Sequence, residues 1–109
     1  MTFEARKLRL ENPNDVVSGK VRCVLIPGHK EFRVGFRYRI QDFFGLTVCI
    51  VKVTKTTKFH SVLSIVEDDS VGEIAEAMGL EDSDSLVSHL KARYKFRLGD
   101  PATLVYFSK

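Results

Sequence analysis

The spacing of hydrophobic residues changes near residue 60. Before it, apolar residues alternate with polar ones or form short runs, which is typical of strands because successive strand side chains point to opposite faces. Such segments cover residues 6–10, 21–26, 36–41 and 46–54, and a last one covers residues 102–107. Segment 46–54 is apolar at almost every position, so we expect a central strand that is buried on both faces.

Capping residues predict one short helix, and helical spacing, with apolar residues three or four positions apart, predicts a later helical insert. Asn12 at the N-cap and Pro13 at the first helical position predict a helix that ends at Gly19. The insert contains three apolar stripes: Phe59, Val62, Leu63 and Val66; Val71, Ile74, Ala75 and Met78; and Leu86, Val87, Leu90 and Tyr94.

The order of these elements predicts an α+β fold in which the helices are grouped. A short helix follows the first strand, three strands come next, and the helical insert precedes the last strand. Within the insert, Ser70 and Glu73 are expected to form a capping box, and Gly79 is expected to end the second helix. We therefore expect a single domain over residues 1–109, built as a small, partly open β-barrel of about five strands.

Charge is distributed unevenly along the chain, which the net charge of +3 conceals. Residues 61–90 contain eight carboxylates and no lysine or arginine, whereas residues 1–60 contain twelve basic and five acidic side chains. A strongly basic surface predicts a polyanionic partner. The acidic segment has several readings: it caps helices, repels nucleic acid, pairs with the basic face of a second copy, or binds a basic protein.

Several classes of protein and site are not expected. No apolar run reaches the length of about 18 residues that spans a bilayer, and no signal peptide is recognisable, so we expect a cytoplasmic protein. Cys23 and Cys49 lie in strand-like segments and are interpreted as buried free thiols. His29, His60 and His89 lack ligand spacing, so no metal and no cofactor are expected.

The candidate site is a set of basic residues interleaved with aromatic ones. Lysine and arginine contact phosphates, and exposed aromatic rings stack on unpaired bases. Arg37 and Arg39 are expected on one strand face, while Tyr38 is a candidate for either the core or base stacking. The predicted RNA-binding residues are Lys20, Arg22, Lys30, Arg33, Arg37, Tyr38, Arg39, Arg93, Lys95 and Arg97. If the fold brings these segments together, they form one cleft.

Short motifs spread over most of the chain resemble an ASCH domain, a family of PUA-like β-barrels. They are Ser18-Gly19-Lys20, Phe32-Arg33-Val34-Gly35, Thr57-Lys58-Phe59 and Leu104-Val105-Tyr106-Phe107. After the glycine, the family usually continues with a second Lys, then Thr, then an acidic residue or Thr, then Arg. This chain has Val21, Arg22, Val24 and Ile26 there, and Gly35-Phe36 replaces the usual Gly-Asp.

The resemblance implies one of two activities. ASCH and PUA-like domains are associated with RNA binding, and some small ASCH proteins are amidohydrolases that act on N4-acetylcytidine with a Lys, a Thr and a Glu. Val24 occupies the hydroxyl position of that set. A register shift of one residue makes Lys20 and Cys23 candidate catalytic residues, with Glu67 or Glu73 as the acid.

The sequence thus favours a non-catalytic RNA-binding protein whose ligand is single-stranded or irregular RNA, such as messenger RNA. The nearest alternative is an amidohydrolase that acts on a modified nucleoside. A further alternative is an adaptor that uses the acidic helices to self-associate or to bind a basic protein partner. Three experiments separate these hypotheses. RNA binding predicts an affinity that falls steeply with salt, and the amidohydrolase predicts release of cytidine from N4-acetylcytidine. The adaptor predicts that charge reversal in the acidic helices removes a protein partner.

Overall fold

A computed structural model describes residues 6–10, 12–28, 32–95 and 97–109. Its elements confirm the predicted α+β order, with the helical insert before the last strand. They are β1 (Arg6–Arg9), α1 (Pro13–Val17), β2 (Cys23–Pro27), β3 (Arg37–Gln41), β4 (Thr47–Phe59), α2 (Val62–Val66), α3 (Val71–Ala77), α4 (Ser83–Arg93) and β5 (Ala102–Ser108). None of the helices in these ranges is long and apolar enough to span a bilayer.

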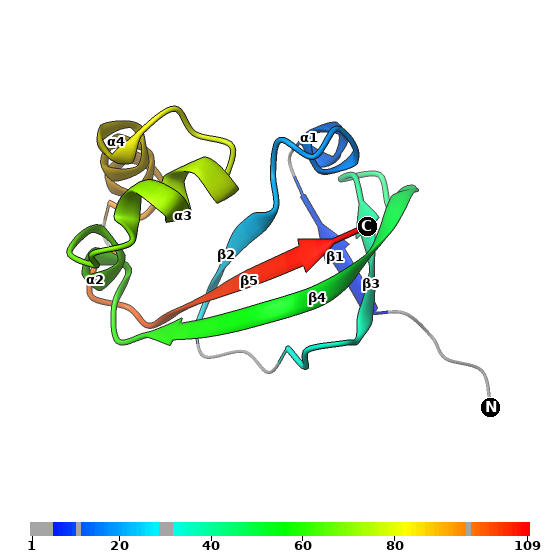
Figure 1. Ribbon diagram of the computed structural model, residues 1–109, viewed down its shortest axis with the longest axis horizontal. Coiled ribbons are helices and arrows are strands. Elements are labelled where there is room, and N and C mark those ends of the chain that lie inside the picture. Colours follow the sequence, from blue (N-terminus) through cyan, green and yellow to red (C-terminus); the bar gives the residue numbers. More distant parts are fainter. Residues whose placement is uncertain (1–5, 11, 29–31, 96) are drawn as a thin grey trace.

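The five strands form one mixed sheet in the order β1-β3-β4-β5-β2. Strands β1 and β3 run parallel, and the other neighbouring strands run antiparallel. The long strand β4 pairs with β3 through its first half and with β5 through its second half. The sheet curls into a half-barrel with β1 and β2 as its edges, which confirms the predicted partly open barrel (Figure 1).

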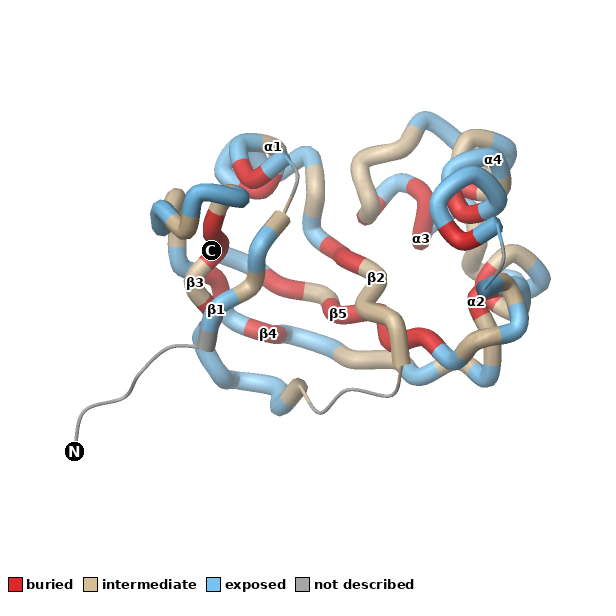
Figure 2. Tube along the Cα trace, turned by 180° about the vertical axis from the view of Figure 1, so that it is seen from behind, coloured by how far each residue is buried: buried red, intermediate tan, exposed pale blue. Residues whose placement is uncertain are grey.

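Two hydrophobic clusters lie on opposite faces of this sheet, because neighbouring residues of β2 and β5 belong to different clusters. Buried positions occur along the strands and in all four helices (Figure 2). One fills the half-barrel and is covered by α1 through Val16. The other lies between the sheet and helices α2–α4, and it includes Cys23 and Leu104. Strands β2 and β5 contribute to both clusters, so they carry apolar residues on both faces, whereas the buried apolar residues of β3, Tyr38 and Ile40, belong to the half-barrel cluster alone.

Strand β4 is central, as predicted, but the expectation that it is buried on both faces is wrong. Ile50 is 52% exposed, and Lys52 and Thr54 are exposed as well. Helices α2–α4 cover only the other end of the sheet, so the first half of β4 has one uncovered face (Figure 1). The strand also continues past residue 54 to Phe59, which was expected to begin a helical stripe.

The capping box lies at another helix than the predicted one. At the start of α3, the Ser70 side chain makes no capping hydrogen bond, and its hydroxyl donates to Asp68 instead. The capping box forms at α2, where the Ser61 hydroxyl accepts from the Ser64 N–H at 3.1 Å and the Ser64 hydroxyl accepts from the Ser61 N–H at 3.2 Å. Because serine replaces the usual Glu or Gln at the third helical position, the sequence pattern did not reveal it.

The remaining helix ends follow the predictions more closely. Asn12 occupies the N-cap of α1 without a side-chain hydrogen bond, and Pro13 is the first helical residue. Gly79 follows the end of α3 with a φ of +80°, a left-handed conformation that favours glycine. A β-carbon at Gly79 would lie 2.9 Å from Cγ2 of Val21 and 3.2 Å from the Lys20 carbonyl oxygen. The end of α3 is therefore packed directly against the segment that precedes β2.

Candidate nucleic-acid interface

Five cations project from one face of strands β1, β3 and the first half of β4. Leu8, Tyr38, Ile40, Val51 and Val53 pack in the half-barrel, so their neighbours along each strand point to the opposite face. We call these neighbours the basic sheet face; its cations are Lys7, Arg9, Arg37, Arg39 and Lys52. Residues that pair across strands have β-carbons about 5 Å apart, so the cations form one continuous surface.

The strand register sets the order of the side chains on this face. Lys7 is opposite Arg39 on β3, and Arg39 is opposite Ile50 on β4. One step along, Arg37 is opposite Lys52. The exposed aliphatic side chain of Ile50 therefore lies on this face opposite Arg39 and two residues before Lys52.

Among the residues that the structure describes, no acid forms an ion pair with these cations. Between residues 32 and 66 the sequence has one carboxylate, Asp42. Its Oδ1 already accepts hydrogen bonds from the N–H groups of Phe44 at 2.9 Å and Leu46 at 3.0 Å. The basic sheet face thus presents a positive field to solvent.

Among the predicted RNA contacts, Arg37 and Arg39 share a face as expected. The prediction for Tyr38 has to be corrected. Tyr38 is only 3% exposed and belongs to the half-barrel core, where its ring centroid lies 5.2 Å from that of Phe32. A ring buried there cannot stack on a base, so the RNA contact predicted for it is wrong. The competing core interpretation is the one that the structure supports.

Arg22 lines a pocket between α3 and the sheet, and both Lys20 and Arg22 line a second pocket between the end of α3 and the segment before β2. The first pocket, of about 360 Å³, is lined by Arg22, Thr54, Glu73, Glu76, Ala77, Tyr106 and Phe107. The second, of about 560 Å³, is lined by Gly19, Lys20, Arg22, Glu76, Gly79, Leu80 and Glu81. Arg22 and Glu76 line both pockets and form an ion pair with an N–O distance of 3.5 Å. These pockets have mixed charge, unlike the basic sheet face.

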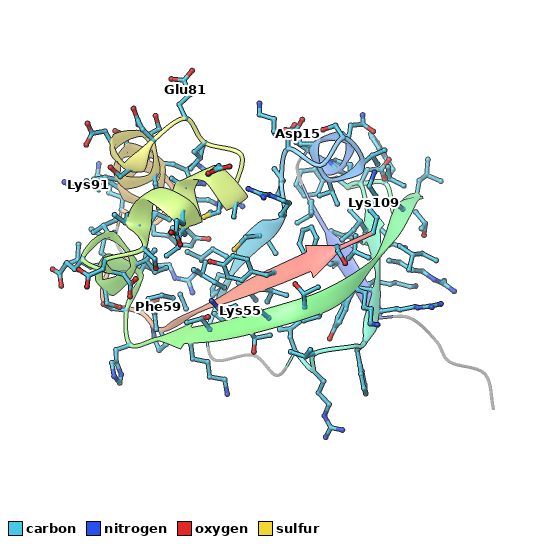
Figure 3. The ribbon with its side chains drawn as sticks, in the orientation of Figure 1. Asp15, Lys55, Phe59, Glu81, Lys91 and Lys109 are labelled. Carbon is cyan, nitrogen blue, oxygen red and sulfur yellow. The ribbon has the colours of Figure 1, made fainter. Side chains whose placement is uncertain are left out.

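A β-bulge connects the basic sheet face with the first pocket. The pairing of β4 with β5 shifts between Val53 and Lys55, so two consecutive residues of β4 project toward the helix side. Thr54 lines the pocket, and the Lys55 ammonium lies 5.3 Å from the centroid of the Tyr106 ring (Figure 3). Positive charge therefore continues from Lys52 along β4 toward α3.

The remaining predicted contacts are elsewhere, so the expectation of a single basic cleft is wrong. Arg93 ends α4, with Lys95 and Arg97 just beyond it; α4 lies at one end of the molecule, and β1 and β3 lie toward the other (Figure 1). Arg97 is paired with Asp100 at 2.9 Å. Arg33 is exposed, with its guanidinium 5.8 Å from the centroid of the Phe36 ring. Lys30 lies outside the described residues.

Comparisons with known proteins bear on the fold. Neither a scan against family models nor a search of curated proteins finds a match. Among solved structures, an ASCH domain from Lactobacillus crispatus matches at 18% identity, over 88% of this chain and 68% of that one, with a TM-score of 0.66. The ASCH protein of Zymomonas mobilis matches at 11% identity, over 96% and 66%, also with 0.66. The chain has an ASCH-like fold.

A DUF984 protein from Enterococcus faecalis also shares this ASCH-like fold, with a TM-score of 0.66 over 99% of this chain and 82% of that one. Its identity to this chain is 14%. The likeness confirms the resemblance seen in the short motifs. At such low identities it concerns the fold, and the activity has to be argued from this chain's own residues.

In the ASCH-like fold of this chain, Cys23 is not placed to act as a nucleophile. It is 1% exposed and lies in the core between the sheet and α2–α4. Burial raises the pKa of its thiol to about 12, and only the thiolate is nucleophilic. Cys23 lines neither of the two pockets, whereas Lys20 lines the second and Glu73 the first. The proposed catalytic set of Lys20 and Cys23 is therefore not assembled in either pocket.

The two thiols are expected to differ sharply in reactivity. At pH 8, with a pKa near 12, about one Cys23 side chain in ten thousand is a thiolate, and the chain around it blocks access. Cys49 is less deeply buried. Titration of the native protein with a disulfide reagent should therefore detect one thiol, and two after unfolding in guanidinium. A Cys49→Ser variant that still reacts quickly in the native state would contradict the burial of Cys23.

Part of the acidic segment has local structural roles. Asp82 caps α4 by accepting a hydrogen bond from the Ser85 N–H at 2.8 Å, and this bond lowers the pKa of its carboxyl. Hydrogen bonds from Ser70 lower the pKa of the Asp68 carboxyl in the same way.

No group of three His, Cys, Asp or Glu side chains that could hold a metal ion occurs in the part of the chain that the structure describes. His29 is outside that part.

Proposed function

We propose that this protein binds single-stranded or irregular RNA through the basic sheet face without catalysing a reaction. The observation that carries the proposal is the set of five cations on one face, none of which has an ion-pair partner in the described ranges. Contacts of lysine and arginine with phosphate supply most non-specific affinity for nucleic acids. The fold of this chain resembles that of ASCH domains, and the association of that family with RNA binding adds support.

The arrangement of charge also favours a direction for the bound strand. From Arg37 and Lys52 the positive charge continues along β4 to Lys55, whose ammonium lies over the ring of Tyr106, a residue that lines the pocket between α3 and the sheet. On the α3 side of that pocket, Glu73 repels phosphate, whereas Glu76 is paired with Arg22. The phosphates are therefore expected on the sheet, and the acidic helix limits how far a strand extends toward α3.

Salt dependence tests the proposal directly. Anisotropy of a labelled single-stranded RNA should give a logarithm of the association constant that falls linearly with the logarithm of salt concentration. The slope for single strands is about −0.7 per phosphate neutralised, so three to five contacts predict a slope between about −2 and −3.5. A slope near zero, or no binding at low salt, would refute RNA binding by this face.

The two alternative functions, an amidohydrolase and a protein-binding adaptor, have less support. The amidohydrolase function lacks its nucleophile because Cys23 is buried and protonated. We therefore expect no cytidine from N4-acetylcytidine incubated with the protein, and a release of cytidine that scales with enzyme concentration would contradict the non-catalytic proposal. Self-association or binding of a basic protein through the acidic helices remains a prediction from the charge of residues 61–90.

A further inference from the structure

Two neighbouring phenylalanines are exposed at the tip of the β3–β4 hairpin. Phe43 is 65% exposed and Phe44 is 91% exposed. Of the eight large apolar side chains that are exposed in the described part of the chain, six lie between residues 34 and 50. Three of these six, Phe43, Phe44 and Leu46, lie at the tip itself, and a group of exposed apolar side chains marks an interaction surface. The tip is therefore a candidate for contact with a ligand.

The backbone of this tip is held in one conformation by its own hydrogen bonds. Asp42 Oδ1 accepts from the N–H groups of Phe44 and Leu46, and the Asp42 carbonyl accepts from the Gly45 N–H at 3.1 Å. The Asp42 N–H donates to the Leu46 carbonyl, also at 3.1 Å. Since the turn is preorganised, binding through the two rings loses little backbone entropy.

A cation lies beside the turn that carries the two rings. The Arg9 guanidinium lies 3.7 Å from the position that a β-carbon on Gly45 would occupy, so a cation of the basic sheet face reaches the turn itself. Ile50 is also exposed and lies on the basic sheet face, opposite Arg39. It adds an apolar side chain to that face. The carboxylate of Asp42 is engaged by two N–H groups. The aromatic tip and the basic sheet face thus adjoin each other.

We infer that Phe43 and Phe44 form a stacking platform for unpaired RNA bases, next to the cations that hold the phosphates. The inference rests on the proposed function and names the part of the surface that distinguishes single strands from duplexes. Aromatic rings stack on any base, whereas the bases of a duplex are already stacked and inaccessible. Charge complementarity favours a polyanion as the occupant, because the charges beside the rings are basic.

A tryptophan probe tests contact between the tip and the bases. The chain contains no tryptophan, so Phe44→Trp introduces a single tryptophan, which can be excited selectively, at the most exposed ring. Single-stranded oligouridine should quench its emission in a saturable way, and a duplex RNA of equal length should quench it much less. Equal quenching by both RNAs, or none by the single strand, would overturn the platform.

Affinity measurements separate stacking from simple apolar contact. The double variant Phe43→Ala/Phe44→Ala should bind single-stranded RNA about 10- to 100-fold more weakly, with the salt slope unchanged. Duplex affinity should not change. The matched control Phe44→Leu keeps an apolar side chain without a ring, so it should lose affinity as Phe44→Ala does. If Phe44→Leu binds like the wild type, the tip makes an apolar contact and stacking is refuted.

Two outcomes distinguish failure of this inference from failure of the proposed function. If the wild-type protein shows no salt-sensitive RNA binding, both fail. If it binds and the double alanine variant binds equally well, only the platform fails. Vesicles of mixed phosphatidylserine and phosphatidylcholine provide the last arm: a blue shift of the introduced tryptophan with vesicles, and no quenching by RNA, would assign the tip to a membrane surface instead.

Discussion

Replacing Arg37 and Arg39 together by glutamate is expected to abolish RNA binding at moderate salt. Both side chains project from the same face of β3, where each faces a neighbour on β4 instead of an acid. Two attractions to phosphate become two repulsions, each of about 1 kcal/mol in water, which corresponds to a loss of about 100- to 1000-fold. Anisotropy with single-stranded RNA measures the loss.

Neutral and remote substitutions serve as controls for that experiment. Arg37→Gln with Arg39→Gln removes two phosphate contacts without adding repulsion, so the salt slope should become shallower by about 1.4. Lys91→Glu makes the same kind of charge reversal on the outer side of α4, away from the sheet (Figure 3). It should leave affinity nearly unchanged. Equal losses for Lys91→Glu and Arg37→Glu would show that only net charge matters.

Loss of binding in the double variant should not reflect unfolding. Arg37 is exposed, and neither arginine forms an ion pair within the described residues. Surface substitutions away from special contacts usually change the free energy of unfolding by no more than about 0.5 kcal/mol. An unchanged urea midpoint alongside the affinity loss therefore assigns the effect to the interface.

The orientation of Arg37 and Arg39 could be predicted from sequence because it depends on local alternation. Apolar side chains at positions 38 and 40 face the core, which forces positions 37 and 39 to the other side. The same argument predicted the burial of Cys23, and its apolar neighbours along β2 supply the reason. Two-residue periodicity needs no knowledge of distant contacts.

The other cations of the face could not be predicted, for two physical reasons. Lys7 and Arg9 join it because β1 pairs in parallel with β3, and pairing between segments about 30 residues apart leaves no local signal. Lys52 and Ile50 looked like parts of a strand buried on both faces. Their exposure depends on which end of the sheet the helices cover.

The bulge in β4 shows why periodicity alone misplaces a functional side chain. Strict alternation puts Lys52 and Lys55 on opposite faces, because three positions separate them. The shift between Val53 and Lys55 adds one residue, and Lys55 pairs with Tyr106 on the helix side. The route of positive charge toward the pocket therefore depends on an irregularity that the hydrophobic pattern does not encode.

A side chain at Gly79 is also expected to have a large effect, in this case on the free energy of unfolding. Gly79→Ala should destabilise the protein by about 2 to 5 kcal/mol. A left-handed backbone costs an alanine about 1 to 2 kcal/mol, and overpacking costs typically 1 to 3 kcal/mol. Both apply, since φ is +80° and the new methyl would lie 2.9 Å from Val21 and 3.2 Å from the Lys20 carbonyl.

Gly72 allows the same substitution to be made where both penalties are absent. It lies within α3, and a β-carbon there would meet nothing within 4 Å. Gly72→Ala should therefore stabilise the protein by about 0.5 to 1 kcal/mol, because glycine is the poorer helix former. Urea unfolding followed by circular dichroism measures both variants, which should shift the midpoint in opposite directions. Shifts of the same sign would contradict the close packing of α3 against the segment that carries Lys20.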